Sequence, residues 1–417
     1  MPLNGEHREP ETGWNSPRDG GEHRRPGPGL LAGQVRLRGE PRGARSNHPN
    51  RRLCNRHPGH CDRRRESDGI LSAARAAHVA TRQVTFVDPK GRQIGRVSPE
   101  DFGRAAGERH VELPRGSLTS LLFELVRTRV NHRFGDAIVS LDDRPDGIDV
   151  DFLSGGRERF DLVVSCEGLH STTRELVFGP ERVFSRYLGY CFAICELPNT
   201  YGLHREAVIY NKPGKAAALY STSDGPTLYG LFTYRRPPPS AEETADPQRQ
   251  RDSIARAFAD DGWLVPGMIS AMKDANDFYF DATMQIHMPA WSAGRVAVLG
   301  DAAYGPSFFT GQGTSMALVG AYMLTGALAT RPDHMSAFRA YEDASRPYMA
   351  ANQRLATDGS TAVAPGSALE LWIRNGMIRL APLLSRFGLV AWVGLAARAT
   401  RAYEALVLPD FDQVSGT

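Results

Sequence analysis

Two places in the sequence join an acidic residue to a glycine directly after a short apolar run. Glu167-Gly168 follows the run FDLVVSC, and Gly300-Asp301 follows the run RVAVL. Runs of this kind are typical of strands buried on both faces of a parallel sheet. A carboxylate beside a glycine at the end of such a strand can bind a polar ligand, because glycine lets the backbone approach it closely.

The second pair continues into a glycine-containing loop and then an apolar, small-residue segment at 314–328 that predicts a helix. The N–H groups of a first helical turn point at negatively charged or carbonyl oxygen. A strand, an acidic residue, a glycine loop and a helix N-terminus together predict a nucleotide-cofactor site. The alternative is an ordinary turn between a strand and a helix. The loop residues expected to contact the cofactor are Pro306, Gly311, Gln312, Gly313 and Thr314.

This segment resembles the "GD" motif of the flavoprotein aromatic hydroxylases, the group A monooxygenases typified by para-hydroxybenzoate hydroxylase. The resemblance implies that Gly300 and Asp301 belong to an FAD site and that Asp301 binds the ribityl or ribose hydroxyls. It also implies that the loop from Pro306 to Thr314 lies along the isoalloxazine ring, with backbone N–H groups near the N1–C2=O edge. A helix N-terminus supplies the positive potential that an anionic reduced flavin needs there.

Two further segments are similar to motifs of the same family. Glu167-Gly168 with Ser171 and Arg174 keeps the spacing of the family's D-G-x-x-S-x-x-R motif, although Glu167 stands where the family has Asp. In the segment LPRGSLTSLL, the family places an arginine that contacts the flavin nucleotide, which would here be Arg115. Taken alone, the first segment could be a strand followed by a capped helix, and Arg115 could be a solvated surface charge.

The resemblance implies an FAD-dependent monooxygenase that consumes NADH or NADPH and O₂. Through a flavin C4a-hydroperoxide, such an enzyme hydroxylates an aromatic or polyketide-like small molecule. The cofactor carries the reaction, while the protein supplies positioning, charge at the flavin edge and a dry pocket. We therefore expect no catalytic side chain and no metal site.

Composition predicts a folded protein with a sizeable apolar core. The chain has 417 residues, 41% of them apolar, and a formal net charge of +3. Its five cysteines lack regular spacing, which favours a reducing cytoplasm over a disulfide scaffold. The longest apolar candidate, Phe387–Ala397, is too short to span a membrane. We expect a cytoplasmic monomer or homodimer without stable membrane insertion and without a nucleic-acid partner.

The first part of the chain differs from the rest. Up to about Asp68 it is crowded with Arg, Pro, Gly and His, has no Lys and shows no apolar periodicity, so we expect disorder. The family's first strand, glycine turn and helix, which hold the ADP part of FAD, belong in this region. Gly27-Pro28-Gly29 is no substitute, because prolines flank its first glycine and no strand precedes it.

Back-translation suggests how this turn was lost. Degenerate codons for Gly20–Gly33, read one base later, permit GASIAGPALAFWL, a sequence of the type that the family has at its first turn. We therefore hypothesise that residues 1–68 are a frameshifted reading of a lost FAD-binding turn. The alternative for this segment is a genuine basic tail that contacts nucleic-acid phosphates. For the whole chain, the alternative to an active enzyme is a catalytically impaired remnant that cannot retain FAD because its first turn is missing. A zinc site is disfavoured, because its four candidates are spaced too tightly: Cys54, His57, His60 and Cys61.

The expected fold is α/β. It combines a Rossmann-like FAD-binding domain of the glutathione-reductase type with an inserted, mostly antiparallel substrate sheet and C-terminal helices. The expected divisions are a disordered segment at 1–68, an FAD-binding part at 69–180 with a short substrate-domain hairpin near 84–98, the substrate sheet at 181–288, the GD segment at 289–350 and a helical region at 351–417. We also expect a polar, helical stretch over about 242–261, and helix breaks at Pro382 and Gly388.

Overall fold

The structure is a computed structural model that describes residues 79, 81–98, 115–386, 398, 401–403 and 405–411. Within these ranges it is a mixed α/β protein with three sheets, in agreement with the expected fold class. The expectations for residues 1–68, for Gly388 and for the apolar segment 387–397 lie outside the described residues.

The largest sheet has seven strands in the order β11-β7-β10-β9-β8-β1-β2. All neighbours are antiparallel except β1 and β8, which run parallel. The carboxylate of Asp88 closes the β1–β2 turn by accepting the N–H groups of Lys90 and Arg92, both at 2.9 Å. The strands are β1 (Gln83–Val87), β2 (Gln93–Val97), β7 (Ser185–Pro198), β8 (Glu206–Lys212), β9 (Lys215–Tyr220), β10 (Thr227–Arg235) and β11 (Tyr279–Ile286).

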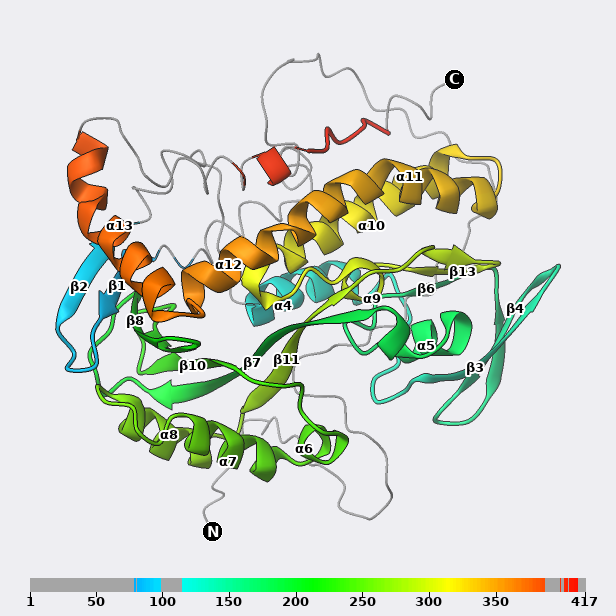
Figure 1. The fold of residues 1–417 in the computed structure, drawn as a ribbon. Helices are drawn as coiled ribbons and strands as arrows, with labels where there is room; N and C mark the ends of the chain where they lie inside the picture. Colours follow the sequence, from blue (N-terminus) through cyan, green and yellow to red (C-terminus); the bar gives the residue numbers. More distant parts are fainter. Residues whose placement is uncertain are drawn as a thin grey trace, which may run out of the picture.

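Three helices lie against one face of this sheet: α6 (Ala241–Ala245), α7 (Pro247–Ala257) and α8 (Val265–Asp274) (Figure 1). Cys191, Ala193 and Cys195 of β7 are buried in the core beneath them. Because side chains alternate along a strand, Phe192 and its like-facing neighbours point to the opposite face. The helical stretch expected over 242–261 is present as two helices, the second of which ends at Ala257. Asp246 ends α6 and caps α7, accepting the N–H of Gln248 at 2.8 Å.

A smaller sheet carries the two acid-glycine motifs. It contains β12 (Ser292–Ala293), β13 (Val296–Val298) and β6 (Val163–Ser165), in the order β12-β13-β6. All three residues of β13 are buried, as expected, but Val164 in β6 is 39% exposed. Within the described part of the chain, β6 therefore lacks full cover on one face. The FDLVVS run is also divided, because Phe160 ends a strand of a third sheet made of β3 (Ile138–Arg144), β4 (Gly147–Phe152) and β5 (Arg157–Phe160).

The remaining helices are α4 (Arg115–Val126), α5 (Thr172–Phe178), α9 (Asp301–Tyr304), α10 (Gly313–Thr330), α11 (His334–Gln353), α12 (Leu355–Val363) and α13 (Ala368–Arg386), with short 3-10 turns η1 (Glu181–Val183) and η2 (Phe308–Thr310). Helices α10 and α11 lie above β13 and β6 in Figure 1. The break expected at Pro382 is wrong, because α13 continues to Arg386. One missing N–H leaves the other helical bonds in place, and Pro347 lies inside α11 in the same way.

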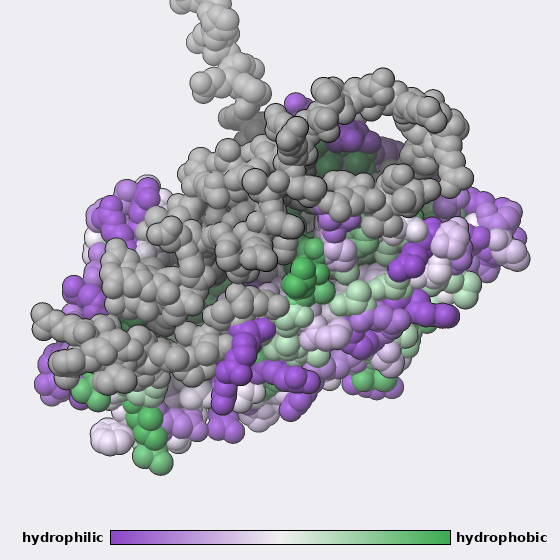
Figure 2. Space-filling view, turned by 90° about the horizontal axis from the view of Figure 1, so that it is seen from above, coloured by the Kyte–Doolittle hydropathy of each residue, from purple (hydrophilic) through white to green (hydrophobic). Residues whose placement is uncertain are grey.

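None of the helices in the described ranges is long and apolar enough to cross a bilayer. Seen from above, the visible described surface places hydrophilic and hydrophobic side chains in small neighbouring patches (Figure 2). The mixed surface contrasts with the continuous apolar core beneath α10 and α11, which contains Tyr304, Met316 and Tyr341.

Candidate functional site

The two acid-glycine motifs follow neighbouring parallel strands. Val163 of β6 pairs with Val296 of β13, and the N–H of Leu299 donates to the carbonyl of Ser165 at 2.9 Å. Both motifs therefore leave the sheet at the same edge. The carboxyl ends of parallel strands are where open α/β sheets bind their ligands.

The carboxylate of Glu167 turns onto the start of α5. It accepts the N–H of Thr173 at 2.8 Å, the hydroxyl of Thr173 at 2.9 Å and the hydroxyl of Ser171 at 2.8 Å. The hydroxyl oxygen of Ser171 in turn accepts the N–H of Arg174 at 3.0 Å. A carboxylate is favourable at a helix N-terminus because the helix dipole is positive there. Glu167 and Gly168 thus fix the turn after β6.

Arg174 ties the two motifs together. Its side chain is fully buried and donates to the carbonyls of Leu169 at 2.7 Å and Ala302 at 3.2 Å, and to the carboxylate of Glu181 at 2.9 Å. Burial lowers the pKa of its guanidinium from the ordinary value, although Glu181 opposes that shift. The Nε atom is buried without a hydrogen-bond partner within the described part of the chain. These contacts favour a role in holding the site together.

Gly300 and Asp301 make the turn from β13 into α9. Gly300 has φ 66°, ψ −141°, a conformation that residues with a side chain rarely adopt. Asp301 is the first residue of α9 and is half-buried. A Cβ placed on Gly313 would lie 3.5 Å from Oδ1 of Asp301, so the start of α10 passes directly beside this carboxylate. The carboxylate of Asp301 thus lies at the N-terminus of α10.

The loop that precedes α10 fits the polar edge of a flavin. Pro306 and Gln312 are buried, whereas Gly311 and Thr314 are exposed. Gly311 has φ 65°, and a Cβ there would meet nothing within 4 Å. No described side chain caps the N-terminus of α10, which begins at Gly313. Its first N–H groups, the open space at Gly311 and the nearby Asp301 therefore suit an oxygen-rich ligand such as FAD. Arg115, the last expected cofactor contact, is the first residue of α4.

Sequence reasoning missed two buried glutamines that hold this loop. Gln285 of β11 donates from Nε2 to the carbonyl of Pro306 at 3.1 Å. Gln353, at the end of α11, donates from Nε2 to the carbonyls of Tyr304 at 3.2 Å and Gly305 at 3.3 Å. The available signal was weak: Gln285 is a polar residue between Met284 and Ile286, and nothing in the residues beside Gln353 marks it as buried.

Aromatic side chains connect the loop to the large sheet. Phe308 of η2 stacks on Phe192 of β7, with 4.8 Å between ring centroids and 10° between ring planes. Phe309 meets Tyr190 edge to face at 5.3 Å, and Tyr279 of β11 lies 5.8 Å from Phe192. The face of the sheet opposite α7 and α8 thus presents an aromatic surface directly at the loop.

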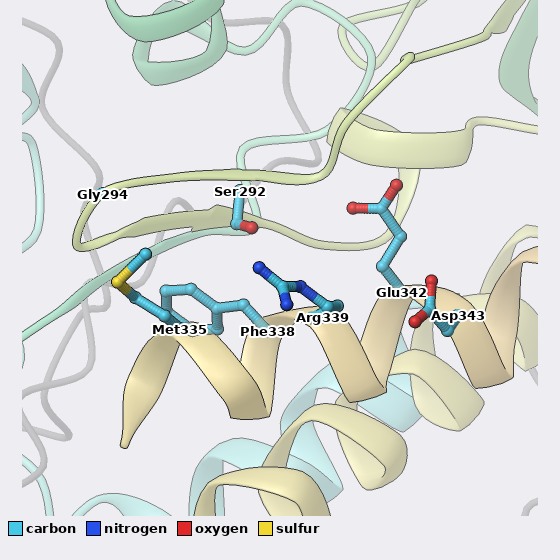
Figure 3. A pocket seen from close by; sticks show the side chains of 7 residues that line it. All are labelled: Ser292, Gly294, Met335, Phe338, Arg339, Glu342 and Asp343. Carbon is cyan, nitrogen blue, oxygen red and sulfur yellow. The ribbon is translucent and has the colours of Figure 1, made fainter.

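A cavity of about 410 Å³ lies elsewhere, between the β12–β13 turn and α11 (Figure 3). Ser292 and Gly294 line it on one side, and Arg339, Glu342 and Asp343 on the other. These residues lie before β13 or on α11, whereas Gly300-Asp301 follows the carboxyl end of β13. The cavity is therefore separate from the acid-glycine motifs.

Comparison with known proteins identifies the family. The family profile described as FAD binding domain matches residues 69–353, starting where the composition of the chain changes. A flavin-dependent monooxygenase from a prokaryote of unknown identity is 34% identical over 346 residues, which cover 82% of this chain and 85% of that protein. A flavin-dependent monooxygenase of Legionella longbeachae is 32% identical over 270 residues, covering 64% of this chain and 69% of the relative.

Solved structures agree with this assignment. The tetracycline destructase Tet(55) is 32% identical and superposes with a TM-score of 0.69, covering 83% of this chain and 85% of its own. Klebsiella pneumoniae HpxO, solved with FAD and uric acid, is 20% identical with a TM-score of 0.62, covering 79% of this chain and 85% of its own, and shows the shared fold. The resemblance to flavoprotein hydroxylases is therefore confirmed: the chain belongs to the FAD binding domain family and is a FAD-dependent monooxygenase.

Proposed function

We propose that this monooxygenase consumes NADH or NADPH and O₂ to hydroxylate a flat aromatic or polyketide-like molecule. Bound FAD, once reduced, would activate O₂ and supply the oxygen atom. The chain's own contribution is to bind the flavin at the acid-glycine edge, orient the substrate and keep water out. The comparisons favour this function over the nucleic-acid-binding alternative.

The aromatic surface beside the loop carries the substrate proposal. Phe308 stacks on one face of Phe192 at 4.8 Å, and Phe192, Phe308 and Tyr279 each keep part of their surface exposed. Offset or face-to-face contact with an aromatic ring favours flat ligands over bulky aliphatic ones. Tet(55) and Tet(51) are titled tetracycline destructases, and a fused-ring molecule of that kind suits such a surface.

The cofactor residues follow from the same geometry. In this proposal Asp301 binds a flavin hydroxyl, and the N–H groups at the start of α10 face the ring's polar edge. Glu167 and Arg174 support the turn that lies next to Asp301. The full proposed set is Arg115, Glu167, Gly168, Arg174, Gly300, Asp301, Pro306, Gly311, Gln312, Gly313 and Thr314.

The domain division remains part of the proposal. Residues 69–180 and 289–350 would form the FAD-binding part, and residues 181–288 the substrate sheet. The pairing of β1 with β8 supports assigning the 84–98 hairpin to that sheet. Residues 351–417 would cover the proposed substrate pocket beside the aromatic surface. The close approach of Gly359 in α12 to the carbonyl of Phe309 supports this role.

The test is whether a flat substrate accelerates NAD(P)H oxidation by the protein supplied with excess FAD, so that a weak cofactor affinity does not limit the rate. Tetracycline, uric acid and 2,6-dihydroxypyridine serve as flat, oxygen-bearing test compounds, with cyclohexanol as an aliphatic control. We expect at least one flat compound to stimulate oxidation and yield a product heavier by one oxygen atom, measured by mass spectrometry. Oxidation that no compound stimulates, or a response to cyclohexanol alone, would contradict the proposal.

A further inference from the structure

Gln285 and Gln353 hold the backbone of the loop before α10 in one orientation; this loop, residues 304–312, is called the flavin loop below. Both side chains are buried. Gln285 binds the carbonyl of Pro306, while the two N–H bonds of Gln353 serve the carbonyl of Ile286 at 2.8 Å and the adjoining loop carbonyls of Tyr304 and Gly305 at 3.2 and 3.3 Å. Gln285 also donates to the backbone carbonyl of Gln353 at 2.7 Å, so the two residues form one connected unit. The N–H of Ile286 adds a bond to the carbonyl of Gly305 at 3.0 Å.

This arrangement determines where the next N–H points. The described part of the chain has no cis peptide bond, and in a trans peptide the C=O and the N–H point in opposite directions. Since the carbonyl of Pro306 points at Gln285, the N–H of Ser307 points away from Gln285. The glutamines thus direct a backbone donor to the other side of the loop.

Ser307 shows that this orientation is imposed on the chain. Its φ of 80° and ψ of 151° lie in a region that is nearly restricted to glycine. Its hydroxyl oxygen is buried and has no hydrogen-bond partner within the described part of the chain. A strained backbone beside an unpartnered buried hydroxyl is typical of a position that meets a ligand.

We propose that Gln285 and Gln353 are positioning residues that turn the Pro306–Ser307 peptide so that the N–H of Ser307 meets a hydrogen-bond acceptor on the flavin ring. This inference rests on the proposed FAD site at the same loop. It adds two residues from outside the acid-glycine motifs to the machinery of the cofactor site. Neither glutamine touches the flavin; each acts through the loop backbone.

A thermal-unfolding measurement without cofactor tests whether Gln285 holds the Pro306–Ser307 peptide in place, an arrangement called the clamp from here on. Ser307→Gly removes the backbone strain, so it should raise Tm by about 2–4 °C in the otherwise unchanged chain. In a Gln285→Leu background the peptide is free to rotate and Ser307 can leave the positive-φ region. The same Ser307→Gly change should then give no rise. An equal rise in both backgrounds overturns the clamp, because the strain would not depend on Gln285.

A flavin titration tests the direction of the N–H. Gln285→Leu should weaken FAD binding at least about ten-fold, measured by quenching of flavin fluorescence. Gln250→Leu is the matched control, because Gln250 is equally buried and donates from Nε2 to the carbonyl of Thr244 at 2.9 Å, away from the loop. Equal weakening in both variants contradicts the inference. If the unchanged chain binds no FAD at all, the Tm comparison alone decides whether the clamp exists.

Discussion

Arg174 and Ala302 are 128 positions apart in the chain, yet the guanidinium of Arg174 donates to the carbonyl of Ala302 at 3.2 Å. Ala302 follows Asp301 in α9, so this bond ties the turn after β6 to the acidic residue after β13. Because Arg174 is fully buried, the bond is shielded from water and the two turns are held together.

Asp301→Ala should weaken FAD retention far more than a surface change of the same type. The substitution removes a charged acceptor for a cofactor hydroxyl, a bond typically worth about 1.5–3 kcal/mol, or roughly 10- to 100-fold in Kd. Asp260→Ala is the control, since Asp260 is exposed in the substrate part of the chain. Titration with FAD measures both variants. Unchanged affinity in Asp301→Ala would rule out the assigned role.

Glu167 is tested by changing its length and its charge separately. Glu167→Asp restores the family residue and should leave FAD binding and reduction by NAD(P)H equal or improved. Glu167→Gln should slow reduction, and it should also lower Tm, because the neutral side chain no longer offers two anionic oxygens to the Thr173 N–H and its neighbours. Stopped-flow reduction and thermal unfolding report the two effects. Equal kinetics in all three proteins, with Tm alone changed, would make Glu167 purely structural.

Whether a feature of the site could be predicted from the sequence depends on how far apart its residues lie along the chain. Both acid-glycine turns were located because a strand, its end and the next helix are encoded by adjacent residues. The contacts of Gln285 and Gln353 could not be predicted, since they join segments 68 positions apart, and that distance closes only when the sheet and α11 have packed. The same holds for Val164, whose exposure depends on what covers β6 and not on its own strand-like neighbours.

We expect the folded protein to lose stability at alkaline pH, because His170 loses its proton there. This residue lies 3.5 Å from Asp281 of the large sheet and 3.1 Å from Glu181, and these carboxylates raise its pKa from 6.5 to about 10. The protonated form is bound more tightly in the folded protein, so the contribution is complete below pH 6.5 and is lost as the pH rises through about 10. The half-exposed side chain keeps the effect modest.

The comparison for this prediction is His170→Gln, which removes the titrating group. Tm measured from pH 6 to pH 10.5 should fall more steeply in the unchanged protein than in the variant. Parallel curves would show that the contacts of His170 with Asp281 and Glu181 contribute nothing in solution.

The last prediction concerns the reading frame of the first part of the chain. We expect the chain as written to bind FAD poorly, because residues 1–68 lack the family's strand, glycine turn and helix in sequence and so lack backbone donors for the pyrophosphate. Within the described residues, β6 pairs with β13 on one side and no described strand pairs with its other edge. An unpaired sheet edge also lowers stability and invites aggregation.

Restoring the shifted frame over the segment that encodes residues 20–32 should therefore yield a yellow protein that oxidises NAD(P)H. The flavin absorbance of each purified protein, divided by its protein concentration, gives the measured occupancy. A control that replaces the same residues with a Gly/Ser linker distinguishes gain of the turn from mere loss of the basic sequence, and it should remain colourless. If the unchanged chain already purifies with stoichiometric FAD, the frameshift hypothesis does not explain its function, and the ADP half of the cofactor must be held by residues other than a first glycine turn.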